Sequence, residues 1–201
     1  MYKVTMILYF IVSYLVGAIP FGKIISYLVG RVNIQEIGSG NIGATNVARV
    51  LGLKWGLLTL IADIGKGALM VKIANYIFND VIIVSCIAVI VVFGHCYPVY
   101  LKFRGGKGVA TACGAFLFID MKAVLFSVLI FVVVMIITRI VSLSSIMAVL
   151  NFPILTSIIE SEKILVYSTL LVALIIVIKH RENINRLMRG EEKRFSFRKK
   201  I

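Results

Sequence analysis

The chain has 201 residues, of which 60% are hydrophobic and 15% are charged, and its formal net charge is +13. This composition excludes an ordinary soluble domain, in which about 45–50% of residues are apolar and about 25% are charged. Nine of the 22 Lys and Arg residues lie between Lys179 and Ile201, with no soluble module of interleaved aromatic residues around them. We therefore set nucleic acid aside as a partner and expect the basic residues to face an anionic membrane surface.

Apolar stretches long enough to form membrane helices follow one another along the chain, since about 20 apolar residues cross a bilayer roughly 30 Å thick. Seven segments are predicted to be such helices: about 4–29, 53–76, 81–101, 108–119, 122–138, 142–159 and 163–179. The fourth is too short to face lipid, which places it inside the bundle or in a broken helix. Pro20 and Pro153 are expected to kink the first and sixth helices without necessarily ending them. The predicted fold is all-α, a polytopic integral membrane protein with about seven transmembrane helices.

Lys and Arg residues are distributed unevenly over the predicted connections, and in membrane proteins they accumulate on the cytoplasmic side. One side collects the basic C-terminal segment and Arg31, Arg49, Lys54, Lys102, Arg104, Lys107 and Arg139. The other side receives a nearly neutral set: Lys3, Asp80, Asp120, Lys122, Glu160, Glu162 and Lys163. This asymmetry predicts an external N-terminus and a cytoplasmic C-terminus. We expect one membrane-embedded domain over residues 1–201, with a basic cytoplasmic tail from about residue 190 and the polar segments 31–52, 102–114 and 179–190 together on the cytoplasmic side.

The first polar segment contains GSGNIG, which matches the G-x-G-x-x-G dinucleotide fingerprint, with Asp63 at a suitable distance. We reject that interpretation because the fingerprint has meaning only between a strand and a helix of a soluble βαβ unit. The glycines still allow successive backbone N–H groups to form a nest for anionic oxygens. The residues expected to bind substrate here are Gly38, Ser39, Gly40, Asn41, Thr45, Asn46 and Arg49.

The second polar segment reads FRGGKGVATACG and is not a Walker A motif, because Gly108 follows Lys107 where Ser or Thr would be required. Gly105, Gly106 and Gly108 are expected to form a second backbone nest at the start of a helix, with Lys107 as a mobile positive charge. The segment therefore predicts a second anion site.

The third polar segment, KHRENINRLMRG, places His180, Asn183 and Arg186 at three-residue steps, so that they share one face if the last helix continues. Two anion nests and this convergent face indicate a substrate with two phosphate groups or two phosphorylated substrates. The second alternative implies transfer between them.

Several other residues have simpler interpretations. Asp63 and Lys66, one helical turn apart, are expected to form a buried structural ion pair that supports the site, and His95 is also expected to be structural. The cysteines are an odd number without metal-ligand spacing, so we predict neither a disulfide framework nor a metal site: Cys86, Cys96 and Cys113. The final segment, EEKRFSFRKKI, carries no motif that we can interpret.

The stretches SGNIGATNVARVLG, FRGGKGVATACG and HRENINRL, with GHCYP before the second, resemble the three cytoplasmic motifs of the bacterial acyl-phosphate:glycerol-3-phosphate acyltransferase family. The resemblance covers the chain from the first helix to about Arg189. It implies transfer of an acyl group from acyl phosphate to the 1-hydroxyl of glycerol 3-phosphate, which gives lysophosphatidic acid and inorganic phosphate in the first step of phospholipid synthesis. It also implies a bacterial inner-membrane enzyme without a cofactor or metal, whose active site faces the cytoplasm.

The resemblance also implies roles for individual residues. Catalytic residues around the glycerol phosphate and the reacting centre would be Ser39, Arg49, Lys107, His180 and Asn183. The acyl phosphate would be held by Thr45, Asn46, Gly105, Gly106 and Gly108. Membrane lipids and the enzyme that forms acyl phosphate are the other partners considered. The sequence does not determine the oligomeric state, the preferred acyl-chain length or the order of substrate binding. A monomer is compatible with the sequence.

An acyl phosphate is already activated, so we expect direct transfer without a covalent enzyme intermediate. His180 could be a general base, or neighbouring Arg181 and Lys179 could keep it a donor that binds phosphate. We favour phosphate binding, with a substrate phosphate oxygen accepting the proton. The H-x-x-x-x-D motif of another acyltransferase group is absent, because Tyr100 follows His95 and Asn185 follows His180 at that spacing. A phosphate transporter and a noncatalytic scaffold for anionic lipid are the alternatives from other classes.

Overall fold

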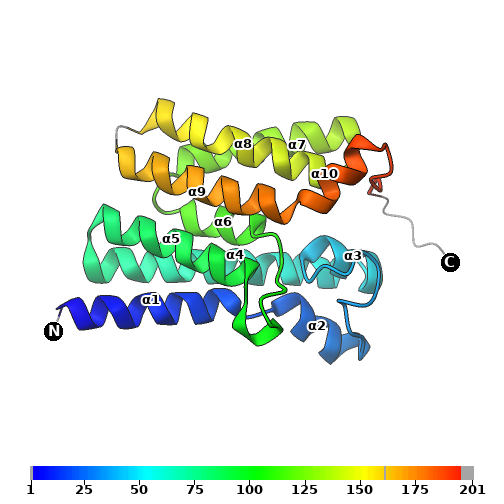
Figure 1. Cartoon of the computed structure of the whole chain (residues 1–201), viewed down its shortest axis with the longest axis horizontal. Helices are drawn as coiled ribbons and strands as arrows, with labels where there is room; N and C mark the ends of the chain where they lie inside the picture. The colour runs from blue at the N-terminus through cyan, green and yellow to red at the C-terminus, as the bar shows by residue number, and fades with distance from the viewer. Residues whose placement is uncertain (1, 161, 196–201) are drawn as a thin grey trace.

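The computed structural model describes residues 2–160 and 162–195, and within these ranges the secondary structure is helical, with no strand. The all-α prediction is therefore confirmed for this part of the chain. The elements are α1 Tyr2–Ala18, α2 Phe21–Gly30, α3 Ala44–Leu51, α4 Leu53–Phe78, α5 Val81–Cys96, the short 3₁₀ helix η1 Val99–Leu101, α6 Val109–Phe116, α7 Met121–Thr138, α8 Val141–Ile159, α9 Lys163–Lys179 and α10 Arg181–Met188. The long helices lie side by side, and α1 begins at the end of the bundle opposite to α2, α3 and α10 (Figure 1).

Four helical segments of the described chain are long and apolar enough to cross a membrane: Tyr2–Gly30, Val81–Leu101, Met121–Thr138 and Val141–Ile159. A fifth is added if α9 and α10, which are bent by 61° relative to each other, form one span. The expected number of seven is not reached by these criteria. The 26 residues of α4 include several charged side chains, and α6 has only eight residues.

The two prolines act differently on their helices. Pro20 separates α1 from α2, so the first expected helix is broken and not merely kinked. Pro153 lies inside α8, which continues to Ile159 as expected. Because proline removes a backbone donor and disturbs the preceding turn, carbonyl groups before it lose partners. At the first break these carbonyl groups have other partners: the Val16 oxygen accepts from the Ile19 N–H at 3.1 Å, and the Ile19 oxygen accepts from the Phe21 N–H at 3.2 Å and from the Lys66 ammonium at 2.9 Å.

The short helix α6 lies inside the bundle, as expected for the fourth segment, and packs mainly against α4. Glycine makes this close approach possible. A Cβ atom on Gly67 would overlap the carbonyl oxygen of Thr111, and a Cβ atom on Gly114 would overlap that of Ile64. The helices therefore meet backbone to backbone, as small residues allow in membrane bundles.

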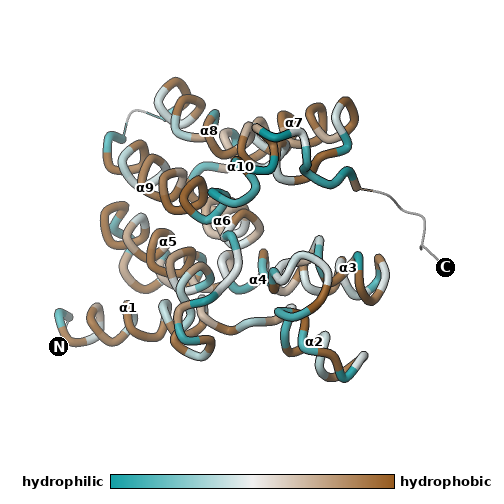
Figure 2. The backbone as a smooth tube through the Cα atoms, turned by 45° about the vertical axis from the view of Figure 1, so that its right-hand side comes forward, coloured by the Kyte–Doolittle hydropathy of each residue, from teal (hydrophilic) through white to brown (hydrophobic). Residues whose placement is uncertain are grey.

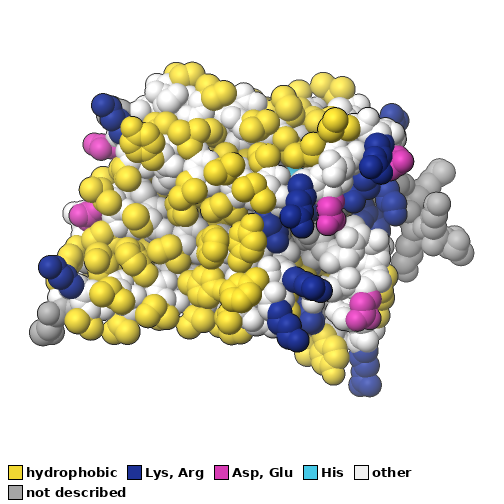
Figure 3. Space-filling view, in the orientation of Figure 1, with side chains coloured by type: hydrophobic (Ala, Val, Ile, Leu, Met, Phe, Trp, Pro, Cys, Tyr) yellow, Lys and Arg dark blue, Asp and Glu magenta, His cyan; other side chains and the backbone are white. Residues whose placement is uncertain are grey.

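The long helices consist mostly of hydrophobic residues, whereas α10 is mainly hydrophilic (Figure 2), and many hydrophobic side chains of the long helices are exposed. On α7, for example, Ile136 and Ile137 are 72% and 75% exposed. In the space-filling view, hydrophobic side chains cover the middle of the molecule and charged side chains gather toward its two ends (Figure 3). This belt has the distribution that a lipid bilayer requires. The end that carries α2, α3 and α10 also contains the candidate site.

Candidate active site

A cavity of about 850 Å³ brings the three polar segments together. Its polar end is lined by ten of the residues expected from sequence: Gly38, Ser39, Asn41, Thr45, Asn46, Arg49, Lys107, Gly108, His180 and Asn183. Arg186 also lines it, whereas Gly40, Gly105 and Gly106 are absent from the lining. Residues separated by more than 140 positions in the chain therefore surround one space.

Asn46 holds the first polar loop in shape. Its side-chain oxygen accepts a hydrogen bond of 2.8 Å from the Ser39 backbone N–H. Its amide nitrogen lies 2.9–3.2 Å from the carbonyl oxygens of Ile34, Ile37 and Asn41. The side chain is 1% exposed. We expected Asn46 to contact a substrate, but its polar atoms already bond the backbone of its own loop, so the geometry gives it a positioning role.

Two of the glycines in the first loop allow a backbone conformation that other residues rarely adopt. Gly38 and Gly40 have φ angles of 71° and 69°, in the left-handed region that favours glycine. The loop leads into α3, whose N-cap residue is Gly43. Arg49 lies in the last turn of α3 and is exposed toward the cavity, where its guanidinium is available to an anion.

The glycines of the second loop have different functions. The Gly106 N–H donates a hydrogen bond of 3.1 Å to the His95 carbonyl oxygen, so this group is not available to the anion nest that we expected. A Cβ atom on Gly105 would overlap the same oxygen, and one on Gly106 would overlap the His95 ring. Gly108, with φ 87°, is the N-cap of α6. An anion would therefore meet Lys107 and the first turn of α6, where helical N–H groups lack intrahelical acceptors.

A chain of hydrogen bonds joins the second and third polar segments. The Lys107 ammonium donates to the Asn183 amide oxygen at 2.5 Å, and the Asn183 amide nitrogen donates to a Glu192 carboxylate oxygen at 2.6 Å. The same carboxylate accepts from the Ser142 hydroxyl at 2.7 Å and from the Arg186 guanidinium at 2.6 Å. The cavity thus has a row of donors that a phosphate group could also use.

Glu192 and Ser142 were not expected from sequence. Glu192 lies in the segment that we could not interpret, and its side chain is only 10% exposed. The feature of the sequence that could have pointed to Glu192 was a pair of acidic residues, Glu191 and Glu192, in an otherwise basic segment. Ser142 gave no comparable signal because it lies in an apolar helix.

The ionisation of this end of the cavity follows from burial and from the hydrogen bonds. Burial lowers the pKa of the Lys107 ammonium from 10.5 to about 8, although the negative charge of Glu192 opposes this shift. Partial burial alone would raise the pKa of Glu192. Hydrogen bonds from Ser142, Arg186 and Asn183 outweigh it, and the pKa of this carboxyl lies below its usual value. At neutral pH the two side chains are oppositely charged.

His180 is neutral at physiological pH. Its burial, together with the charge of Lys107, lowers the pKa of the imidazole from 6.5 to about 4. Its Nδ1 lies 2.8 Å from the Ile176 carbonyl oxygen, which only accepts, so Nδ1 carries the proton and Nε2 is an acceptor. The favoured sequence interpretation made His180 a donor to phosphate. The structure instead presents an acceptor, suited to a substrate hydroxyl.

The expected ion pair of Asp63 and Lys66 is confirmed, with Nζ and Oδ1 2.9 Å apart and both side chains almost fully buried. Lys66 Nζ also lies 2.9 Å from His95 Nδ1. Asp63 and His95 line the cavity beneath the second glycine loop. In the described part of the chain no group of His, Cys, Asp or Glu side chains could hold a metal ion.

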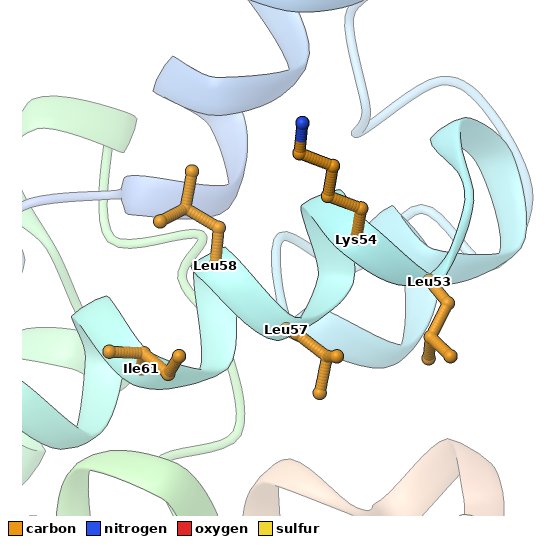
Figure 4. Close-up of a pocket in the computed structure, with 5 residues that line it drawn as sticks. All are labelled: Leu53, Lys54, Leu57, Leu58 and Ile61. Carbon is orange, nitrogen blue, oxygen red and sulfur yellow. The ribbon is translucent and has the colours of Figure 1, made fainter.

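The cavity continues into an apolar groove between α4, α6, α7 and α8. Its apolar lining includes Leu57, Leu60, Ile64, Cys113, Val124, Val128, Phe131, Val132, Val149 and Phe152. On the outer surface of α4 a shallow depression is lined by Leu53, Lys54, Leu57, Leu58 and Ile61 (Figure 4). Leu53 and Leu57 line both the depression and the cavity, so the lipid-facing surface of α4 is continuous with the groove.

Comparison with known proteins identifies the family. Residues 7–190 match the family model described as glycerol-3-phosphate acyltransferase. The chain belongs to this acyltransferase family. A glycerol-3-phosphate acyltransferase of Syntrophotalea carbinolica is 47% identical over 185 residues, which are 91% of this chain and 94% of the relative. That of Geobacter sulfurreducens is 42% identical over 184 residues, covering 92% and 94% of the two chains.

Two crystal structures share the fold of this acyltransferase. The glycerol 3-phosphate form of PlsY, an integral membrane glycerol 3-phosphate acyltransferase, has a TM-score of 0.91 at 38% identity and covers 96% of each chain. Its lysophosphatidic acid form has a TM-score of 0.89 at 36% identity, also with 96% coverage of each. The resemblance found in the sequence is therefore confirmed, as are acyl transfer to glycerol 3-phosphate and a multi-pass membrane fold.

Proposed function

We propose that this acyltransferase takes its acyl group from acyl phosphate and transfers it to the 1-hydroxyl of glycerol 3-phosphate. The products are lysophosphatidic acid and inorganic phosphate, in the first step of phospholipid synthesis. One observation carries the proposal: a single cavity has cationic and amide side chains at one end and an apolar groove at the other. Such a cavity suits a donor with an anionic head and a hydrocarbon chain, because the chain can stay in lipid while the head enters the polar end.

The polar residues divide between the two phosphates. Ser39, Arg49, Lys107 and Asn183 bind glycerol 3-phosphate and surround the reacting centre. The Gly108 N-cap and the first turn of α6 face the acyl phosphate together with Thr45. The remaining residues shape and position the loops that carry these groups: Gly38, Gly40, Asn41, Asn46, Gly105 and Gly106.

The reaction needs alignment and charge stabilisation more than it needs a nucleophile from the protein. Alignment of a hydroxyl with an acyl carbonyl contributes about 7–11 kcal/mol when the geometry is close to that of the transition state. One well-placed donor to a developing oxyanion contributes about 3–4 kcal/mol. The C–O bond to the hydroxyl forms as the bond to phosphate breaks, without a covalent enzyme intermediate.

The hydroxyl proton goes to a phosphate oxygen of the substrate. Nε2 of the neutral His180 accepts a hydrogen bond from the neighbouring 2-hydroxyl of glycerol 3-phosphate, which orients the substrate and leaves the proton of the 1-hydroxyl free to move to that phosphate oxygen. A pKa of about 4 makes this ring a weak base, so it is better suited to orientation than to holding the proton.

The chain forms one domain in a bacterial inner membrane, with seven crossings, an external N-terminus and a cytoplasmic active site. The positive-inside distribution supports this orientation, because the end with α2, α3 and α10 carries most of the Lys and Arg residues of the connections. In this orientation the enzyme that forms acyl phosphate would deliver it from the cytoplasmic side.

The proposal is tested with purified protein in lipid, supplied with palmitoyl phosphate and glycerol 3-phosphate. Lysophosphatidic acid and phosphate are expected in equal amounts without ATP or added metal. A parallel reaction with palmitoyl-CoA tests the donor, and Lys107→Met protein controls for uncatalysed transfer. Product from palmitoyl-CoA alone would contradict the acyl-phosphate assignment, and uptake of glycerol 3-phosphate into vesicles without product would favour a transporter.

A further inference from the structure

The buried group formed by Asp63, Lys66 and His95 connects three parts of the bundle. Asp63 and Lys66 belong to α4, and His95 lies one residue before the end of α5. The Lys66 ammonium is 2.9 Å from the Asp63 carboxylate and 2.9 Å from His95 Nδ1. It also donates to the carbonyl oxygen of Ile19, at the break between α1 and α2. Lys66 of α4 thus contacts α5 and the break between α1 and α2 through a single side chain that is 4% exposed.

His95 in turn supports the second glycine loop. Its carbonyl oxygen accepts the Gly106 N–H, and its ring fills the space where a side chain at position 106 would lie. Lys107 follows directly, so the position of its ammonium depends on a backbone that rests on His95. The other end of the Lys107 side chain is held by Asn183.

The contact with Lys66 also determines the protonation of the His95 ring. An ammonium group has only donors, and it lies nearer to Nδ1, at 2.9 Å, than the Asp63 carboxylate oxygen does, at 3.5 Å, so we assign Nδ1 as the acceptor. A neutral ring then carries its proton on Nε2. This is the nitrogen that faces Gly106. The ring is therefore held in one orientation and one tautomer against the loop.

We propose that Asp63, Lys66 and His95 form a positioning triad, which holds the Gly105–Gly108 backbone and Lys107 in the geometry that acyl transfer requires. The triad acts through the loop and need not contact the reacting atoms. The inference depends on the proposed function only for the identity of the acyl donor, since Lys107 and the loop would serve any transfer to glycerol 3-phosphate. Displacements of about 1 Å at a reacting centre can reduce turnover about 100-fold, so a support of this kind has a measurable effect.

The test is the double variant Asp63→Asn/Lys66→Met, which removes both buried charges at once. Because no unpaired charge is left buried, such replacements are often tolerated by the fold. We expect a folded protein whose melting temperature is close to the parental value and whose kcat/KM falls about 100-fold, the effect of a small misplacement of the reacting groups. KM should rise for at least one substrate, which loss of stability alone would not cause.

A matched control is available at the other end of the bundle. The Asp120 carboxylate accepts a hydrogen bond of 2.7 Å from Thr156, and the two residues are 2% and 0% exposed. Asp120→Asn/Thr156→Val removes an equally buried polar pair outside the cavity lining. It is expected to lower the melting temperature and to leave kcat and both KM values at the parental level.

The tautomer supplies a second, independent readout. The chain has only two histidines, so ¹⁵N-histidine NMR spectra of the parent and of His180→Gln assign His95 directly. We expect a neutral ring with its proton on Nε2. A proton on Nδ1 would overturn the inference, and so would a folded double variant that keeps the parental kcat and KM values.

If the double variant does not fold, two single variants of His95 test the positioning role of the triad. In His95→Gln the amide oxygen can accept a hydrogen bond from Lys66, and the amide nitrogen can replace the N–H donor of the ring. His95→Leu has neither an acceptor nor a donor in its side chain. Higher kcat/KM in the Gln variant supports the triad, and equal values contradict it. If the parental protein is inactive with acyl phosphate but active with another acyl donor, the proposed function is contradicted. The His95 variants can then still be compared with that other donor, so the test of the triad remains separate.

Discussion

The Lys107 ammonium is bonded at 2.5 Å to the side-chain oxygen of Asn183, which lies 76 residues further along the chain. This bond connects the second glycine loop to α10 and places a cation beside the amide that also contacts Glu192. The orientation of Asn183 is defined by these two partners, since its oxygen faces a donor and its nitrogen faces an acceptor. The pair forms the centre of the proposed glycerol phosphate site.

Replacement of Lys107 by methionine should lower kcat/KM by about 10²–10³-fold, the effect of removing one donor from a developing charge. Methionine retains most of the length of the side chain, so the loss would report the charge. Lys102→Met is the matched control, because Lys102 is exposed in the same connection and lies outside the cavity lining. Steady-state kinetics in lipid measure both variants, and equal effects would contradict a direct role for Lys107.

The pH dependence should reflect the ammonium of Lys107. Its pKa of about 8 means that the charge is lost as pH rises through this value, so kcat/KM of the free enzyme should fall above about pH 8. Glu192→Gln removes a negative charge that raises the pKa of Lys107, and the midpoint should therefore move to lower pH. Glu191→Gln, in the exposed neighbouring residue, should leave it in place. An upward shift in the Glu192 variant would be incompatible with this account.

His180→Gln should retain measurable turnover, with a loss smaller than the roughly 10²–10⁴-fold that removal of a general base causes. Glutamine can donate to the Ile176 carbonyl oxygen and accept from a hydroxyl, as the neutral ring does. Turnover and glycerol 3-phosphate binding are measured separately. Loss of turnover with intact binding would restore the assignment of His180 as the base.

Gly106→Ala should reduce activity, because the new Cβ atom would overlap the His95 ring and push the loop away from it. Gly65→Ala is the control, since a Cβ atom on Gly65 meets nothing within 4 Å. Alanine in a helix interior is favoured over glycine by about 1 kcal/mol, so the control should be as stable as the parent or more stable. Comparable kcat/KM in the two variants would show that the contact with His95 is unimportant.

The sequence was most informative where local patterns decide structure. Apolar runs located α1, α5, α7, α8 and α9. The spacing of His180, Asn183 and Arg186 predicted that they would point at one site if the helix continued. All three line the cavity, but the helix does not continue, because α9 and α10 are bent by 61° relative to each other and His180 lies at the break. The three motifs and their order along the chain were sufficient to identify the family. The length of the fourth segment left two alternatives, a place inside the bundle or part of a broken helix, and the structure shows α6 inside the bundle against α4.

The sequence was less informative about what each polar atom does. Asn46 and Gly106 both looked like ligands for an anion, but Asn46 bonds its own loop and the Gly106 N–H is used by His95. Glu192 was overlooked because its partners come from α8 and α10 and no local pattern identifies them. These roles depend on distances of about 3 Å between segments far apart in the chain.

By itself the sequence determined that this chain is a helical membrane protein with three glycine- and amide-containing segments on one side, because hydropathy and motif spacing are local properties. Only the tertiary structure decided which groups remain available to a substrate. Burial and packing set the tautomer of His180, the lowered pKa of Lys107 and the support of its loop by Lys66 and His95. Hydrogen bonds are satisfied by whichever donor and acceptor the fold brings within reach, and that proximity is a property of the whole bundle.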